Sequence, residues 1–115
     1  MNATTPKVAP PPHLTEASQR LFCRIVLDYG LKGDDPALTL LRLALEAADR
    51  ADEARQRIAQ DGVLLADRFG QLRPHPSVAI ERDSRLAAAR LLRELGLSPD
   101  ETAHDNNRPP RPAAR

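Results

Sequence analysis

Residues 67–83, "DRFGQLRPHPSVAIERD", decide the fold of this chain, because the sequence pattern changes twice within them. A turn around Gly70 separates two short apolar pieces, "VLLA" and "QLR", and this arrangement predicts a β-hairpin over about residues 63–73. Two prolines then enclose His75, and a charged, alanine-containing run follows them. That run predicts a helix, so the stretch joins a hairpin to a helix.

His75 has two interpretations at this junction. Its backbone is biased toward extended geometry, because a residue that precedes a proline is steered away from the α region. On the preferred interpretation "RPHP" ends the hairpin and starts the helix; on the other, His75 belongs to a ligand site. A lone hairpin is marginal in water, so this one must pack on a helix or on a neighbouring molecule. We expect Phe69 and Leu72 to fold it against the helices.

The fold class predicted around this stretch is mainly α. Apolar residues recur at helical spacing over about residues 15–29, 36–61 and 77–95. Only 3% of the residues are aromatic, so the core must consist largely of leucine and alanine, which are strong helix formers. Thr15 is the expected N-cap of the first helix, and Asp34 or Asp35 that of the second.

The second predicted helix is too long and too apolar for a small monomer. Its length of roughly 39 Å exceeds the diameter of about 30 Å expected for a compact domain of this size. Its first half, "ALTLLRLALEAA", is apolar nearly all round, which predicts burial on more than one side. We therefore expect an oligomer whose interface includes Leu38, Leu40, Leu41, Leu43, Leu45, Phe69 and Leu72.

Both ends of the chain are rich in proline and lack an apolar period, so they cannot bury enough surface to become ordered. The predicted organisation is a disordered N-terminal arm (residues 1–13), one helical domain (residues 14–102) and a disordered basic tail (residues 103–115). No segment approaches 18 consecutive apolar residues, which predicts a soluble, cytoplasmic protein without a membrane contact.

Catalytic chemistry finds little support in the sequence. The single cysteine, Cys23, excludes an intrachain disulfide and a cysteine-based zinc cluster, and we expect it to be a buried or half-buried apolar group. There is no phosphate-binding or dinucleotide-binding glycine motif. The acidic residues of the second helix alternate with arginines, as on a solvated face. We predict no catalytic residue, no metal site and no cofactor.

Basic side chains are the better functional lead. The formal net charge of +1 argues against a strongly basic DNA-coating protein, but local groups of arginines remain. The alternative for each of them is a solvated surface of mixed charge. Weak contacts from one copy would sum to strong, salt-dependent binding in a ring. The candidate DNA contacts are Arg20, Arg24, Lys32, Arg108, Arg111 and Arg115.

Residues 61–99, "DGVLLADRFGQLRPHPSVAIERDSRLAAARLLRELGLSP", resemble the small subunit of tailed-phage terminase, the P-twenty-seven family. The resemblance consists of a glycine, a short hairpin, "HP" or "NP", a charged helix and a closing "LGL(S/T)P", in that order. The first two predicted helices also resemble those of the family, so the likeness covers nearly all of residues 14–99. No single motif is specific, but the ordered series is.

The resemblance implies a non-enzymatic component of viral genome packaging. Members of the family form homo-oligomeric rings, bind double-stranded viral DNA near the packaging start, and recruit and regulate the large terminase subunit, which holds the ATPase and the nuclease. They act in the host cytoplasm during phage assembly. DNA passing through the ring and DNA wrapped outside it both stay open. The C-terminal tail contacts either DNA or the large subunit.

Two alternatives to this function stay open from the residues. The first is a small helical DNA-binding transcriptional regulator of prophage origin, although a hairpin between the second and third helices argues against the usual helix-turn-helix. The second is a structural adaptor that never contacts nucleic acid.

Overall fold

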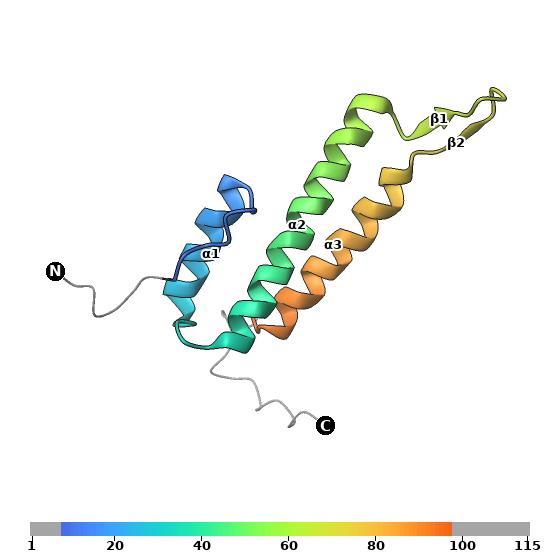
Figure 1. The fold of residues 1–115 in the computed structure, drawn as a ribbon. Helices are drawn as coiled ribbons and strands as arrows, with labels where there is room; N and C mark the ends of the chain where they lie inside the picture. Colours follow the sequence, from blue (N-terminus) through green and yellow to red (C-terminus); the bar gives the residue numbers. More distant parts are fainter. Residues whose placement is uncertain (1–7, 98–115) are drawn as a thin grey trace.

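The computed structural model describes residues 8–97 and shows three helices and one hairpin (Figure 1). The elements are α1 (Glu16–Tyr29), α2 (Asp35–Asp61), β1 (Leu64–Ala66), β2 (Leu72–Pro74) and α3 (Pro76–Glu94). These bounds agree with the predicted ones to within one or two residues, and the mainly helical fold is confirmed. The predicted basic tail lies outside the described residues, as does the first half of the predicted N-terminal arm.

Local capping groups set the starts of the first two helices. Thr15 Oγ1 accepts a hydrogen bond of 3.2 Å from the Ser18 backbone N–H, which confirms Thr15 as the N-cap of α1. Gly30, with a φ of 63°, ends α1 in the left-handed region that favours glycine. Of the two candidate caps of α2, Asp34 is the one used, because its Oδ1 accepts from the Ala37 N–H at 3.1 Å.

The main apolar core lies between α1 and the first half of α2. Phe22 and Val26 of α1 pack there against Leu41 and Leu45 of α2, together with Leu14 just before α1. Leu41 is 0% exposed and Leu45 is 2% exposed. The other side of α2 is covered by α3, which runs back along it (Figure 1). The predicted burial of α2 on more than one side therefore occurs within a single chain.

Small side chains form the contact between α2 and α3. The buried positions of α3 are Ser77, Ser84 and Ala88, and they recur at spacings of seven and four residues. Such spacing keeps them on one face of the helix. On its side, α2 also buries several alanines. Small side chains allow two helix axes to approach closely but bury little apolar surface.

The hairpin extends beyond the helices instead of folding against them (Figure 1). Its strands pair only with each other, antiparallel, with Leu64 opposite Pro74 and Ala66 opposite Leu72. Phe69 is 77% exposed and Leu72 is 67% exposed. The expectation that Phe69 and Leu72 pack on the helices is therefore wrong. Packing on a neighbouring molecule stays a prediction.

His75 fixes the direction in which the hairpin leaves the helices. Its backbone N–H donates to the Val63 carbonyl at 2.8 Å, and its ring is buried. Nδ1 accepts from the Ser77 N–H at 3.0 Å, so the ring proton lies on Nε2, which is 2.9 Å from Asp61 Oδ2. His75 thus caps α3 and ties its start to the end of α2. The preferred interpretation of "RPHP" is confirmed.

Candidate DNA-contact and assembly surfaces

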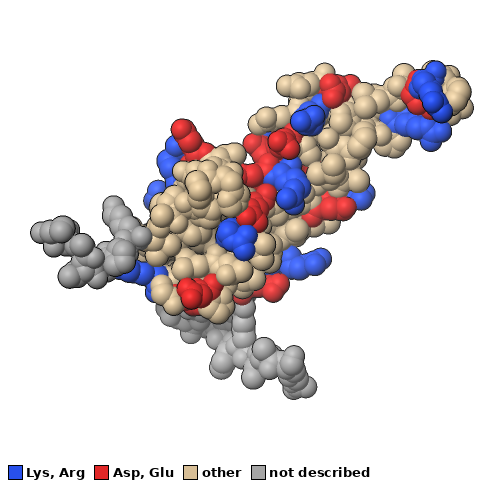
Figure 2. Space-filling view, in the orientation of Figure 1, with Lys and Arg blue, Asp and Glu red and all other residues tan. Residues whose placement is uncertain are grey.

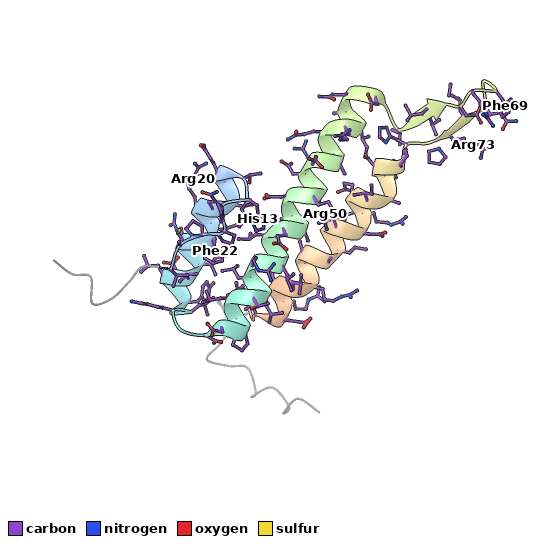
Figure 3. All side chains as sticks on the ribbon, viewed as in Figure 1. His13, Arg20, Phe22, Arg50, Phe69 and Arg73 are labelled. Atoms are coloured by element: carbon purple, nitrogen blue, oxygen red, sulfur yellow. The ribbon has the colours of Figure 1, made fainter. Side chains whose placement is uncertain are left out.

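Two of the predicted DNA contacts lie one turn apart on the outer side of α1. Arg20 is on the side away from α2 (Figure 3), and the side chains of Arg20 and Arg24 are 75% and 79% exposed. Each forms a long ion pair with an exposed acidic residue: Arg20 with Glu16 at 3.9 Å, and Arg24 with Asp28 at 3.7 Å. Exposed pairs of this kind contribute about 0–1 kcal/mol, so phosphate groups can replace them.

Lys32 lies in the exposed turn after α1 and adds a further positive charge past the end of that helix. Together with Glu16, Arg20, Arg24 and Asp28 it forms a set of three positive and two negative groups, with a net charge of +1. The three arginines predicted in the tail lie outside the described residues. Three of the six predicted DNA contacts therefore lie within the described residues, two on α1 and one in the turn after it.

The hairpin carries basic residues that the sequence reasoning missed. Blue side chains gather at the hairpin end of the molecule, whereas positive and negative groups alternate over the helices on the visible face (Figure 2). Arg73 pairs with Asp67 at 2.9 Å. Arg68 has no ion-pair partner among residues 8–97, and its guanidinium lies 5.1 Å from the centre of the Phe69 ring. Arg68 and Arg73 lie on either side of the predicted turn at Gly70, and this spacing could have indicated from the sequence that the hairpin carries basic residues.

Asp67 organises the turn at the end of the hairpin. Its Oδ1 accepts from the backbone N–H groups of Phe69 at 2.8 Å and of Gln71 at 2.9 Å. Its Oδ2 accepts from Arg73 Nε at 2.9 Å. The hydrogen bond from Arg73, with those from Gln71 and Phe69, holds the pKa of Asp67 below its ordinary value. The ionised carboxylate therefore stabilises this conformation of the turn.

Acidic residues of α2 bind the start of α1. Asp49 accepts from the backbone N–H and the hydroxyl of Thr15, each at 2.9 Å, and from the hydroxyl of Ser18 at 2.5 Å. Glu46 Oε2 lies 2.6 Å from His13 Nε2 and 2.9 Å from Arg42. Because of these contacts, the interpretation of the acidic residues as a solvated face is wrong for Glu46 and Asp49.

Glu46 has a perturbed pKa. Burial by itself would raise this pKa, but the hydrogen bonds from His13 and Arg42 outweigh it, and the pKa of Glu46 lies below its ordinary value. Its role is structural, because it joins the segment before α1 to α2. No group of three His, Cys, Asp or Glu side chains within residues 8–97 is arranged to hold a metal ion.

The predicted interface residues divide into three groups by their location. Leu41 and Leu45 belong to the chain's own core and have no surface to offer a neighbour. Leu38 and Leu40 are half-buried near the start of α2, and Leu43 beside them is 38% exposed. Phe69 and Leu72 lie beyond the other end of α2, on the hairpin. Among the predicted interface residues, those with exposed surface therefore lie at the two ends of the molecule.

Two further expectations concern Cys23 and membranes. Cys23 is exposed, so the prediction of a buried or half-buried cysteine is wrong. Its position on α1 turns it away from the Phe22 and Val26 side of the helix, which forms the core. Across the described part of the chain, no helix combines the length and the apolar character needed to cross a membrane.

The described part of the chain is elongated, because the hairpin extends past the ends of α2 and α3 (Figure 1). Residues 8–97 thus define a small helical chain that leaves both basic and apolar surface without a partner in a single copy.

The sequence model of a family described as phage terminase, small subunit, matches residues 34–107. The matched range includes α2, the hairpin and α3, and it is more than half of the chain. The chain therefore belongs to the phage terminase small-subunit family, as the resemblance implied. No significant match is found among curated proteins or among solved structures.

Proposed function

We propose that this chain is a non-catalytic component of phage genome packaging. It forms a homo-oligomeric ring, binds double-stranded viral DNA near the packaging start, and recruits and regulates the large terminase subunit in the cytoplasm of the host cell. The observation that carries this proposal is the family match over the continuous unit of α2, the hairpin and α3. ATP hydrolysis and DNA cleavage belong to the large subunit.

The shape of a single chain supports the ring. Within residues 8–97, a hairpin that no helix covers leaves apolar side chains exposed that a more compact domain would bury. Neighbouring copies supply the missing contacts. In a ring, each copy contributes only one or two phosphate contacts, and the summed binding is strong.

The alternative of a prophage transcriptional regulator finds less support. A helix-turn-helix joins two helices by a turn of three or four residues, and its second helix enters the major groove. Here α2 and α3 are joined by the hairpin, and the buried side of α3 lies against α2. The hairpin precedes α3 in place of the short turn that would present the first residues of this helix to the major groove.

Native mass spectrometry tests the proposed function. We expect one closed species of many copies, and we expect this species to bind duplex DNA. A dimer that binds DNA would favour the transcriptional regulator, and an assembly that binds no duplex at low salt would favour a structural adaptor. A monomer at all concentrations would contradict the ring.

A further inference from the structure

Two apolar surfaces of this chain lie without a partner at opposite ends of α2. One is the hairpin tip, which we define as Arg68 and Phe69 with the apolar face of the two strands. The other is the Leu38 groove, an open groove of about 480 Å³ beside the first half of α2. Figure 3 shows Phe69 at one end of the molecule and Phe22, part of the groove lining, toward the other.

The strand register makes one face of the hairpin entirely apolar. Leu64 pairs with Pro74 and Ala66 pairs with Leu72, so these four side chains point to the same side of the two-stranded sheet. Leu64 is 52% exposed and Leu72 is 67% exposed. Because a hairpin of three-residue strands is marginal alone, burial of this face would stabilise it.

The tip is already ordered for binding. Asp67 holds the turn through the N–H groups of Phe69 and Gln71, and Gly70 takes the φ of 80° that the turn requires. Phe69 projects from this turn with Arg68 stacked on one side of its ring at 5.1 Å. An aromatic side chain on a rigid turn loses little conformational freedom when it binds, and aromatic and arginine side chains are frequent anchors of interfaces.

The Leu38 groove offers matching chemistry. Val8, Pro11, Phe22 and Leu38 contribute its apolar lining. Two charged residues also line it, Asp35 and Arg42, and Arg42 pairs with Glu46 at 2.9 Å. Because Glu46 balances the charge of Arg42, the groove combines an apolar lining with one negative charge, Asp35, that has no ion-pair partner within residues 8–97. The hairpin tip combines an aromatic ring with one positive charge, Arg68, that likewise has no ion-pair partner within that range.

We propose that the hairpin tip of one copy seats in the Leu38 groove of a second copy, with Phe69 on the apolar lining and Arg68 toward Asp35. This inference rests on the self-assembly in the proposed function and names the surfaces that perform it. The two surfaces differ and lie at opposite ends, so the contact is head-to-tail. Each copy offers one tip and one groove, and such a contact repeats until the ring closes.

The chemistry of the hairpin favours a protein partner over DNA. Leu64, Phe69 and Leu72 have no group that binds phosphate. Around the turn, Arg68 and Arg73 are balanced in part by Asp67, which leaves a net charge of only +1. A second copy accounts for both unpartnered surfaces at once, whereas the large subunit would account for one.

The first test compares Phe69→Ser with Leu27→Ser. Leu27 is 80% exposed on α1, belongs to neither surface, and is the matched control. Sedimentation of the full chain over a range of concentrations measures self-association. We expect Phe69→Ser to weaken self-association about tenfold or more, because it removes the anchor, and Leu27→Ser to leave it unchanged. Circular dichroism verifies that both variants keep their helices.

The second test locates the contact by disulfide formation between copies. In a Cys23→Ser background, one copy carries Gln71→Cys beside the tip and another, of different tagged size, carries Thr39→Cys in the groove. Neither substitution removes Arg68, Phe69 or Asp35. On mild oxidation we expect a mixed cross-linked species. The control pair, Gln71→Cys with Ala59→Cys on exposed α2 surface, is expected to give none.

The outcomes separate this inference from the proposed function. A wild-type chain that stays monomeric contradicts the proposed ring itself. The tip-to-groove contact is overturned, and the ring is left intact, by a different set of results. In that case the wild type is oligomeric, Phe69→Ser self-associates as strongly as the wild type, and no mixed cross-link forms. Normal assembly of Phe69→Ser with impaired capture of the large subunit, or with impaired DNA binding, also overturns the inference and assigns the hairpin to that partner.

Discussion

His75 performs two tasks with one imidazole ring, since Nδ1 caps α3 and Nε2 contacts Asp61. We expect His75→Ala to lower the free energy of unfolding by about 2 kcal/mol, because an N-cap contributes about 1 kcal/mol and the hydrogen bond to Asp61 is removed as well. His75→Asn keeps a capping oxygen but is too short to reach Asp61, so we expect about half of that decrease. Urea unfolding measures both.

The difference in free energy of unfolding between the two variants is the informative result. Equal stability of His75→Ala and His75→Asn would show that the cap contributes nothing. The family pattern described above has "HP" or "NP" here, and both histidine and asparagine accept a hydrogen bond at an N-cap. What they share is the acceptor, and only histidine adds the contact with the end of α2.

Glu46 makes the stability of the folded chain depend on pH. Its pKa is lowered in the folded state by His13 and Arg42, against the effect of burial. The resulting stabilisation is fully present above the ordinary value of 4.5 and is lost as the pH falls through the lower folded value. We expect Glu46→Gln to lower the free energy of unfolding more at pH 7 than at pH 3.

Urea unfolding at the two pH values tests this, with Glu53→Gln as the control on an exposed glutamate of the same helix. A destabilisation by Glu46→Gln that is the same at both pH values would show that the carboxylate is not the source of the effect.

At the scale of elements, the contact between α2 and α3 depends on small side chains. Ala88 is 8% exposed within it, whereas Ala89 is exposed on the same helix. We expect Ala88→Leu to lower the free energy of unfolding by about 1–3 kcal/mol, because extra methylene groups overpack a close helix contact. Ala89→Leu is expected to change it by less than about 0.5 kcal/mol. Thermal unfolding of both variants measures the difference.

The elements themselves were predictable from the sequence because their signals are local. Thr15, Asp34 and Gly30 mark helix ends within a few residues of the groups they contact. The packing was less predictable. Asp49 contacts Thr15 across 34 positions of sequence, and nothing in the pattern around either residue indicates it. The direction of the hairpin depends on the tertiary contact of His75 with Asp61, so the exposure of Phe69 had no local signal.

At the scale of the whole molecule, DNA binding is expected to depend on the outer side of α1. Replacing Arg20, Arg24 and Lys32 together with glutamine should weaken duplex binding and flatten its salt dependence. In a plot of log affinity against log salt, the slope should fall by about 0.9 for each phosphate group that the variant no longer neutralises. Fluorescence anisotropy at several salt concentrations measures both quantities.

The control removes the same charge elsewhere: Arg55, Arg57 and Arg90, which are exposed on α2 and α3, are replaced with glutamine. An affinity and slope equal to wild type in the α1 variant would remove α1 from the DNA-contact surface. Equal decreases in both variants would indicate that net charge, not position, determines binding.

The basic tail gives the last prediction. Deletion of residues 106–115 removes Arg108, Arg111 and Arg115, and we expect DNA affinity to fall about tenfold or more because several copies lose these charges together. Pull-down of the large subunit is measured on the same protein. Unchanged DNA affinity with impaired capture of the large subunit would assign the tail to that partner.

The two-stranded sheet has two free edges, and each strand is only three residues long. Pro74 ends β2 without a backbone N–H to donate, and Arg73 places a charge beside it. Addition of a further strand at the β2 edge is therefore disfavoured despite the exposed leucines. Contacts along β2 then depend on side-chain fit and not on main-chain pairing, so we expect a concentrated stock of the subunit to form fibres less readily through this edge.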